Sequence, residues 1–159
     1  MKVYLVQHAE ALSEEQDPDR PLSDAGRRHA EQVARVAAEL EVEVAEIRHS
    51  GKTRARQTAE ILGQALSPPQ GVKAISGLSP MDHAGPVAEK LDRASEPVML
   101  VGHLPFMERL AGQLLAGDAH RPVISFTNAG IVCLERQDDG GWQAIWILTP
   151  EIAEVRIQV

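Results

Sequence analysis

Cysteines, aromatic residues and long apolar runs are all scarce in this sequence. The single cysteine among 159 residues, Cys133, excludes an intrachain disulfide. Two Trp, one Tyr and two Phe make up 3% of the chain, so its core must consist of aliphatic side chains. No apolar run approaches the roughly 20 residues of a membrane-spanning helix, and the first residues lack the features of a signal peptide. We therefore expect a cytoplasmic protein that does not bind membranes.

Positive charge is also in the minority. The chain has 16 Lys and Arg against 23 Asp and Glu, which gives a net charge of −7. This balance disfavours nonspecific binding to nucleic acid, so any anionic substrate must be held by a local group of cationic side chains. With 43% apolar residues, no internal repeat and no low-complexity linker, the chain is expected to form a single domain over residues 1–159.

Two apolar runs that each end in a histidine are the most informative feature present. They are Val-Tyr-Leu-Val-Gln-His at 3–8 and Val-Met-Leu-Val-Gly-His at 98–103. Runs of this kind, without polar alternation, predict strands buried on both faces, as in a parallel sheet covered by helices. Ligands of such sheets bind beyond the carboxyl ends of the strands. If the two strands are neighbours, His8 and His103 share one crevice, and the sequence predicts a two-histidine active site.

Between and after these runs, helix and strand patterns alternate. Ser23 is a candidate helix N-cap, and apolar residues recur at helical spacing from Ala30 to Leu40. Further helices are expected over 55–66, 87–91 and 105–117, and further strands over 43–48 and 72–75. The segments 129–134 and 142–148 flank Asp-Asp-Gly-Gly and predict a β-hairpin. Together these elements predict an α/β fold, a three-layer sandwich whose central sheet is mostly parallel with an antiparallel edge.

Arg54 follows a third predicted strand, so three strand ends supply His8, His103 and Arg54. A lone histidine at such a place is more often a capping or surface residue than a catalytic one. The combination is more specific, because neutral imidazole is a nucleophile that forms covalent intermediates and guanidinium binds phosphate oxygens through two parallel hydrogen bonds. Phosphoryl transfer depends on positioning and charge stabilisation. The sequence thus predicts a phosphoryl-transfer site in which His8 is the nucleophile and no metal or cofactor is needed.

Four segments in order resemble the motifs of the histidine phosphatase superfamily, and they span nearly the whole chain. They are Val-Gln-His-Ala-Glu (6–10), Arg-Pro-Leu-Ser-Asp-Ala-Gly (20–26), His-Ser-Gly-Lys-Thr-Arg-Ala-Arg-Gln-Thr (49–58) and Val-Gly-His-Leu-Pro (101–105). Their spacing is most similar to that of small bacterial members, the phosphohistidine phosphatases of the SixA type. The resemblance implies a phosphoglycerate mutase-like fold, with His8 as phosphoryl acceptor, Arg54 as phosphate clamp and His103 as second histidine. It also implies a cofactor-independent hydrolase whose partner is a phosphorylated signalling or phosphotransfer protein.

Position 7 departs from the family motif, because Gln7 stands where the family has arginine. The Gln7 carboxamide still donates a hydrogen bond to phosphate, but it lacks the positive charge and the planar, two-pronged donor geometry of the arginine guanidinium. A hydrogen bond to an ionised group contributes about 1.5–3 kcal/mol, so we expect catalysis to be slowed by about one to two decades. Arg20 ranks first and Lys52 second as residues that restore positive charge, while Arg56 is expected to point away from the site. Ala9 in place of glycine only requires a backbone that tolerates a Cβ.

The residue that protonates the leaving group is less distinct in the sequence. Asp82 and His83 lie in a predicted loop, and Glu10 lies two residues beyond His8. For Asp82, a role at the site and a place in a solvated loop are equally favoured, whereas a solvated loop is favoured for the other two. The candidate substrate-binding residues are thus Gln7, Arg20, Lys52 and Asp82.

Two further functions stay open from the residues alone. The same chemistry can serve small phosphate monoesters, and Gln7 is compatible with a phosphate-binding or phosphohistidine-sensing module of low turnover. Other motifs fail, since Gly-Lys-Thr at 51–53 lacks the first glycine of a Walker loop and His-Ala-Glu at 8–10 has no Cys-x-x-Cys partner for zinc. We therefore expect no metal site. The sequence does not indicate an oligomeric state.

Overall fold

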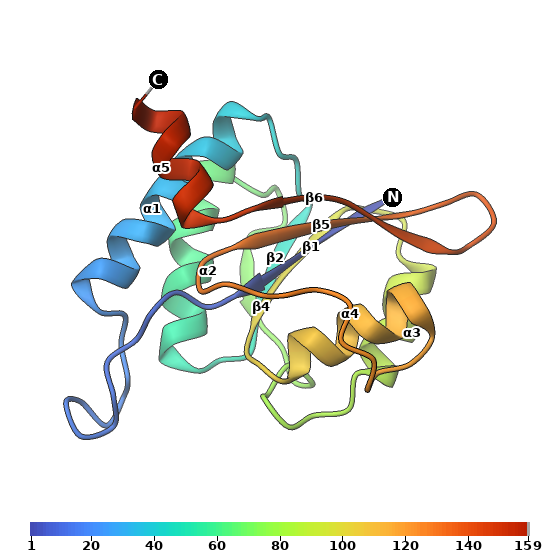
Figure 1. The fold of residues 1–159 in the computed structure, drawn as a ribbon, viewed down its shortest axis with the longest axis horizontal. Helices are drawn as coiled ribbons and strands as arrows, with labels where there is room; N and C mark the ends of the chain where they lie inside the picture. The colour runs from blue at the N-terminus through green and yellow to red at the C-terminus, as the bar shows by residue number, and fades with distance from the viewer. Residues whose placement is uncertain (159) are drawn as a thin grey trace.

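Within residues 1–158, which the computed structural model describes, the fold is organised around a six-stranded mixed sheet (Figure 1). The strands lie in the order β3-β2-β4-β1-β5-β6. The first four are parallel to one another, β5 pairs antiparallel with β1, and β6 pairs antiparallel with β5. The expected parallel sheet with an antiparallel edge is confirmed. The bounds are β1 Lys2–Gln7, β2 Glu46–His49, β3 Val72–Ala74, β4 Val98–Gly102, β5 Ile131–Arg136 and β6 Trp142–Leu148.

The two apolar runs form β1 and β4, and these strands are neighbours. They pair in parallel, with Gln7 opposite Gly102 at their ends. All five residues of β4 and the four central residues of β1 are buried, because helices cover both faces of the sheet. Both strands end at the same edge, so His8 and His103 leave the sheet side by side. The predicted placement of the two histidines side by side has its basis in this register.

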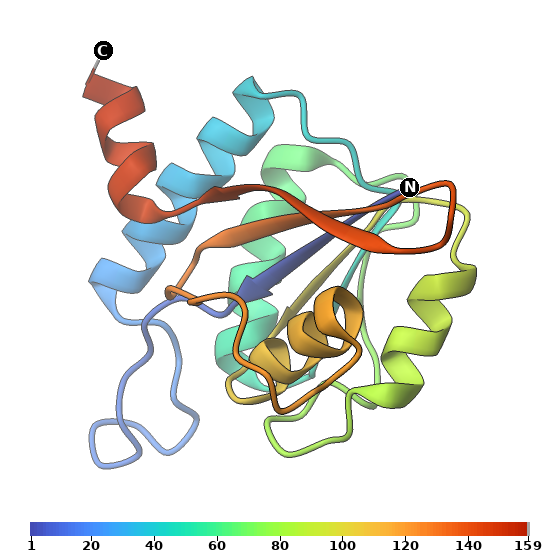
Figure 2. The same cartoon turned by 45° about the vertical axis from the view of Figure 1, so that its right-hand side comes forward.

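Helices on both faces complete three layers (Figure 2). One hydrophobic core joins α1, α2 and α5 to one face of the sheet, and a second joins α3 and α4 to the other. None of the helices within residues 1–158 combines the length and the apolar character that a membrane-spanning segment needs. The bounds are α1 Asp24–Glu39, α2 Thr53–Leu66, α3 Gly85–Arg93, α4 Phe106–Ala116 and α5 Pro150–Gln158.

Local sequence signals explain where α1 and α4 begin and end. Ser23 is extended, and its side-chain oxygen accepts a hydrogen bond from the Gly26 N–H, as expected of an N-cap. At the end of α4, Gly117 adopts the left-handed conformation, which glycine does without steric cost. The helix itself begins at Phe106, directly after Pro105. Helix ends of this kind are readable because their chemistry is local.

The structure differs from the sequence-based expectations at two strand starts and in one helix. β2 begins at Glu46, three residues later than expected. β5 begins at Ile131, because Ala129 has a φ of 64° and belongs to a turn in which the Gly130 N–H donates to the Thr127 carbonyl. Helix α5 is not predicted by any periodic apolar stripe, since Pro150 and Ala153 are its buried residues. It is stabilised by packing against α1 rather than by a local pattern.

Candidate active site

His8 and His103 lie together at the carboxyl edge of the parallel strands. The backbone N–H of His8 donates to the Gly102 carbonyl at 2.9 Å, which extends the pairing of β1 and β4 up to the histidines. The two imidazole rings are 5.1 Å apart between centroids and are tilted by 55°. His8 is half-buried, whereas His103 is only 2% exposed. The structure therefore brings together the two histidines that the sequence pairs.

The imidazole of His8 is held in the form that a nucleophile needs. Its Nδ1 lies 2.7 Å from the carbonyl oxygen of Ala9. A carbonyl only accepts hydrogen bonds, so Nδ1 carries the proton and the neutral ring has its lone pair on Nε2. Burial lowers the pKa of His8 below the ordinary 6.5, the bond to Ala9 raises it, and the charges of Arg54 and Arg20 lower it again. His8 is therefore neutral at pH 7, with Nε2 available to attack an electrophile.

His103 is a neutral hydrogen-bonding group beside this nucleophile. Its Nε2 lies 2.6 Å from the Ser50 hydroxyl oxygen. Burial is the main factor that lowers its pKa to about 3. Nearby groups that act in the same direction are His8, Arg54, Lys52 and Arg20. In the absence of an anion, His103 therefore contributes a hydrogen-bonding ring rather than a positive charge.

Arg54 enters the site from the first turn of α2. Gly51 has a φ of +91°, which glycine adopts without strain, and it turns the chain from β2 toward the helix. The Thr58 hydroxyl donates to the Arg54 carbonyl at 2.8 Å and accepts the Ala9 N–H at 2.9 Å. Ala9 is fully buried and is not among the residues with positive φ, so its Cβ is tolerated as expected. These bonds tie the helical turn that carries the guanidinium to the segment that carries His8.

Three buried polar atoms lack a hydrogen-bond partner in the described part of the chain. They are Gln7 Oε1, Arg54 Nε and His103 Nδ1. Buried polar atoms are nearly always paired, and an unpaired one costs about 1–3 kcal/mol. All three belong to residues that the sequence assigns to the site. Unpaired atoms concentrated in one constellation are typical of a place that binds an external polar group.

Arg20 and Lys52 add positive charge around the histidines. Arg20 lies at the end of the loop after β1, has a φ of 49°, and donates from Nε to the Leu12 carbonyl at 3.0 Å. Besides burial, its charge lowers the pKa values of both histidines and of Arg54, so Arg20 is within electrostatic reach of all three. Lys52 is exposed and acts on the pKa of His103. Whether either residue contacts substrate stays a prediction.

The side chains of Asp82 and Glu10 form hydrogen bonds with groups other than the two histidines. Asp82 lies in the loop between β3 and α3, where its Oδ2 accepts the Ser79 N–H at 2.9 Å. The carboxylate of Glu10 is exposed and accepts a hydrogen bond from the Ser23 hydroxyl at 2.7 Å. Asp82 as a substrate-binding residue therefore also stays a prediction.

Sequence reasoning missed several residues that hold the site together. Ser50 contacts His103, and its place just after a strand was a usable signal. A Cβ on Gly26 would lie 2.0 Å from the Glu10 carbonyl oxygen, so this glycine permits α1 to approach the segment after His8. The Asn128 side chain donates to the His8 carbonyl at 2.9 Å across 120 residues of sequence. Nothing local in the sequence indicates that last contact.

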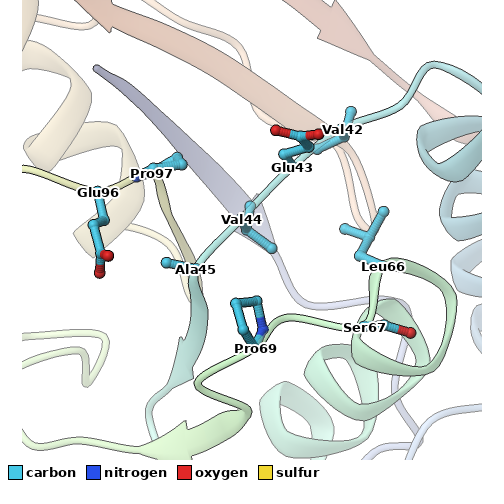
Figure 3. Close-up of a pocket in the computed structure, with 9 residues that line it drawn as sticks. All are labelled: Val42, Glu43, Val44, Ala45, Leu66, Ser67, Pro69, Glu96 and Pro97. Atoms are coloured by element: carbon cyan, nitrogen blue, oxygen red, sulfur yellow. The ribbon is translucent and has the colours of Figure 1, made fainter.

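A separate cavity of about 350 Å³ lies near the opposite, amino-terminal edge of the parallel strands (Figure 3). It is lined by residues that precede β2 and β4 and by the end of α2. Its ionisable lining residues are Glu43 and Glu96, whose negative charges disfavour a phosphoryl group. Cavity volume therefore does not identify the site, and the cationic edge with the two histidines is the better candidate.

Comparisons with known proteins point to one family. Residues 3–83 match the model of the histidine phosphatase superfamily (branch 1). The chain is 26% identical over 155 residues to the phosphohistidine phosphatase SixA of Escherichia coli (strain K12), with 94% of each chain covered. It is 30% identical over 141 residues to an uncharacterised protein of Picosynechococcus sp., with 84% of each chain covered. A structure of the protein histidine phosphatase SixA complexed with tungstate matches with a TM-score of 0.81 at 27% identity, covering 94% of this chain and 97% of that chain.

Proposed function

The chain belongs to the histidine phosphatase superfamily, and from this premise we propose that it is a phosphohistidine phosphatase that works through a phosphorylated His8. One observation carries the proposal. The Nδ1 of His8 is bound to the Ala9 carbonyl at 2.7 Å, which leaves the Nε2 lone pair of a neutral imidazole beside the donors of the site. The similarity to a SixA structure that holds tungstate, an oxyanion, supports a phosphoryl group as the ligand.

The proposed reaction has two displacements at phosphorus. In the first, Nε2 of His8 attacks phosphorus, a bond from Nε2 to phosphorus forms, and the bond between phosphorus and the substrate nitrogen breaks. The leaving imidazole departs as a neutral ring when its second nitrogen is already protonated. In the second, water attacks the phosphorus of phospho-His8, and the bond from Nε2 to phosphorus breaks with its electron pair returning to Nε2. Inorganic phosphate leaves, and the proton lost by water goes to solvent or phosphate. His8 is thereby regenerated in its neutral form.

Charge on the transferred phosphoryl group is stabilised by the cationic residues of the site. Arg54 is partly buried, and its buried Nε has no partner among the described residues. A guanidinium in this position binds two phosphoryl oxygens at once. Arg20 adds a second guanidinium, which is anchored at Nε and keeps its terminal nitrogens for another acceptor. We propose that Arg20 supplies the charge that Gln7 lacks, with Lys52 at the exposed rim.

The proposed substrate class follows from the positions of the acids. An alkyl phosphate ester leaves as a poor alkoxide unless an acid protonates it. The two carboxylates considered for this role, on Asp82 and Glu10, bind Ser79 and Ser23 respectively. A phosphohistidine needs no such acid, because its leaving ring carries its own proton. This argument favours phosphohistidine on a signalling or phosphotransfer protein over small phosphate monoesters.

Substrate comparison with the purified chain tests the proposal. We expect kcat/KM to be highest for a phosphohistidine-bearing phosphotransfer protein, lower for an aryl phosphate and lowest for alkyl phosphates. His8→Ala is expected to reduce turnover of every substrate by at least about three orders of magnitude. His120→Ala is the matched control, because this histidine is exposed on the loop after α4.

Two results would replace the proposal with another function. Alkyl phosphates hydrolysed as efficiently as the phosphohistidine protein would identify a small-molecule phosphomonoesterase. Tight binding of vanadate without turnover of any substrate would identify a phosphate-binding or phosphohistidine-sensing module, the function that Gln7 leaves open. Undiminished turnover in His8→Ala would exclude the proposed nucleophile.

A further inference from the structure

Ser50 contacts the site, yet the reaction proposed above gives it no role. It directly follows β2 and is partly buried. Its Oγ lies 2.6 Å from Nε2 of His103 and accepts the backbone N–H of Lys52 at 3.3 Å. The hydroxyl therefore contacts one nitrogen of the buried imidazole, while Nδ1 has no partner within residues 1–158.

The contact between Ser50 and His103 has two possible directions, because a neutral imidazole carries one proton. If Nε2 carries it, Nε2 donates to Oγ, the hydroxyl proton finds no acceptor among the described residues, and Nδ1 presents a buried lone pair. If Nδ1 carries it, the hydroxyl donates to Nε2, Oγ accepts from Lys52, and Nδ1 presents an N–H. In the second arrangement, the Ser50 hydroxyl both donates to His103 and accepts from Lys52. The Nδ1 N–H of His103 is then the one donor without a partner.

We propose that Ser50 is a positioning residue that fixes the proton of His103 on Nδ1, so that the ring offers an N–H to the phosphoryl group. The inference rests on the proposed function, because the phosphoryl oxygen is the acceptor it requires. A lone pair on Nδ1 would instead repel a phosphoryl oxygen. Choosing the tautomer thus decides whether His103 stabilises or opposes the bound anion.

The surroundings of His103 explain why its tautomer matters. Burial keeps the ring neutral in the free protein, and the positive charges of Arg54, Lys52 and Arg20 act in the same direction. A doubly protonated ring would offer an N–H at both nitrogens without any help from Ser50. In a neutral ring, only one nitrogen carries a proton, and the hydroxyl determines which one.

Nitrogen-15 NMR of the His103 side chain tests the tautomer in the free protein, without requiring turnover. We expect the wild-type ring to be protonated on Nδ1 and bare on Nε2, with the signals assigned by their loss in His103→Asn. Ser50→Ala is expected to shift the proton wholly or partly to Nε2, and Ser50→Thr, which keeps the hydroxyl, is expected to retain it on Nδ1. A wild-type ring protonated on Nε2, or an unchanged ring in Ser50→Ala, would overturn the proposal.

Kinetics test whether the tautomer is used in the reaction. With a phosphohistidine protein as substrate, Ser50→Ala is expected to lower kcat about tenfold, which corresponds to one hydrogen bond, while Ser50→Thr stays within about threefold of wild type. Ser125→Ala is the control, because this serine is exposed. A shifted tautomer with unchanged kcat would overturn the proposal.

Failure of the proposed function gives a different pattern. If the wild-type protein turns over no substrate, the NMR measurement still reports the tautomer. Vanadate is then the probe, and Ser50→Ala is expected to bind it about tenfold more weakly than wild type or Ser50→Thr. Equal affinity in all three proteins would contradict a role for Ser50 in presenting the Nδ1 proton.

Discussion

Two places in the sheet bury polar groups, and they treat them in opposite ways. At the start of β2, Glu46 is 7% exposed, yet one carboxylate oxygen binds Arg48 and the other binds Lys73. At the carboxyl edge of the same parallel strands, three site residues each bury a nitrogen or oxygen that has no partner within residues 1–158. At Glu46, the protein itself supplies partners for both buried carboxylate oxygens, whereas the three buried atoms at the carboxyl edge have none among the described residues.

The effect on protonation separates the roles of these two places. The hydrogen bond from Arg48 is the largest of several factors that lower the pKa of Glu46, so its charge is stabilised in the folded state. His103 has a pKa of about 3 because burial and nearby positive charges disfavour its protonation. A group of unneutralised cationic and polar side chains is unfavourable for folding but suited to a phosphoryl dianion. Buried polar atoms without partners, rather than burial itself, therefore distinguish the edge that carries the candidate site.

Arg54→Ala is expected to have the largest effect at the unpaired edge, because it removes the proposed phosphate clamp. We expect kcat/KM for a phosphohistidine protein to fall by about 10²–10³-fold, the cost of one preorganised donor to a developing charge. Arg56→Ala is the matched control, since Arg56 is exposed and pairs with Glu60 at 3.2 Å, as expected of a residue pointing away from the site. An equal loss in both variants would show that the effect is structural rather than catalytic.

The second guanidinium is tested at Arg20. Arg20→Ala is expected to lower kcat/KM about tenfold through the loss of one charged donor, while Arg28→Ala, which removes an exposed arginine of α1, leaves it unchanged. In the Arg20→Ala background, Gln7→Arg is expected to restore most of the activity, because it returns a guanidinium to the residue that directly precedes His8. Abolished activity in Gln7→Arg alone would show that the site is built around glutamine instead.

Glu46→Gln tests whether the ion-paired Glu46 contributes to stability rather than to activity. We expect the free energy of unfolding at pH 7 to fall by about 1–2 kcal/mol, as one charged hydrogen bond and an exposed ion pair are weakened, with kcat/KM unchanged. Because the folded-state pKa of Glu46 is lowered, its contribution is present above the ordinary value of 4.5 and is lost as pH falls through the folded pKa. Denaturant unfolding at several pH values measures this, with Glu43→Gln as an exposed control. A loss of activity without a loss of stability would contradict the assigned roles.

The protonation of His8 can be tested in the wild-type protein, without any substitution. Since its pKa is lowered from 6.5, the neutral nucleophile persists below pH 6.5, and the acid limb of kcat/KM is expected below that value. NMR titration of the His8 ring separates this limb from the titration of the substrate phosphoryl group, whose pKa is about 6. A His8 that titrates at or above 6.5 in the free protein would be inconsistent with its burial beside two guanidinium groups.

Much of the fold was predictable because its signals are local. Side-chain and backbone chemistry within a few residues determines the strands that are buried on both faces, the N-cap at Ser23 and the end of α4 at Gly117. The structural match to SixA confirms the expected phosphoglycerate mutase-like fold. Helix α5 was not predictable, because it depends on packing against α1 and has no apolar stripe of its own.

At the site, the residues at strand ends were predictable and their supports were not. His8, Arg54 and His103 stand at boundaries where parallel strands deliver side chains to one edge. Asn128 joins the site only through a turn that lies 120 residues from His8. Burial is the largest cause of the depressed pKa of His103, and groups from three separate segments, at His8, Arg20 and the start of α2, add to it in a way that sequence spacing does not reveal.

Identification of the phosphorylated residue during turnover tests whether His8 is the phosphoryl acceptor. The protein is mixed with a phosphohistidine substrate, quenched in alkali at a series of times during turnover, and digested for peptide mapping. We predict phosphate that is stable in alkali and labile in acid on His8, and no such phosphate in His8→Ala. Turnover with phosphate on His103, or with none on His8 at any time, would show that His8 is not the nucleophile.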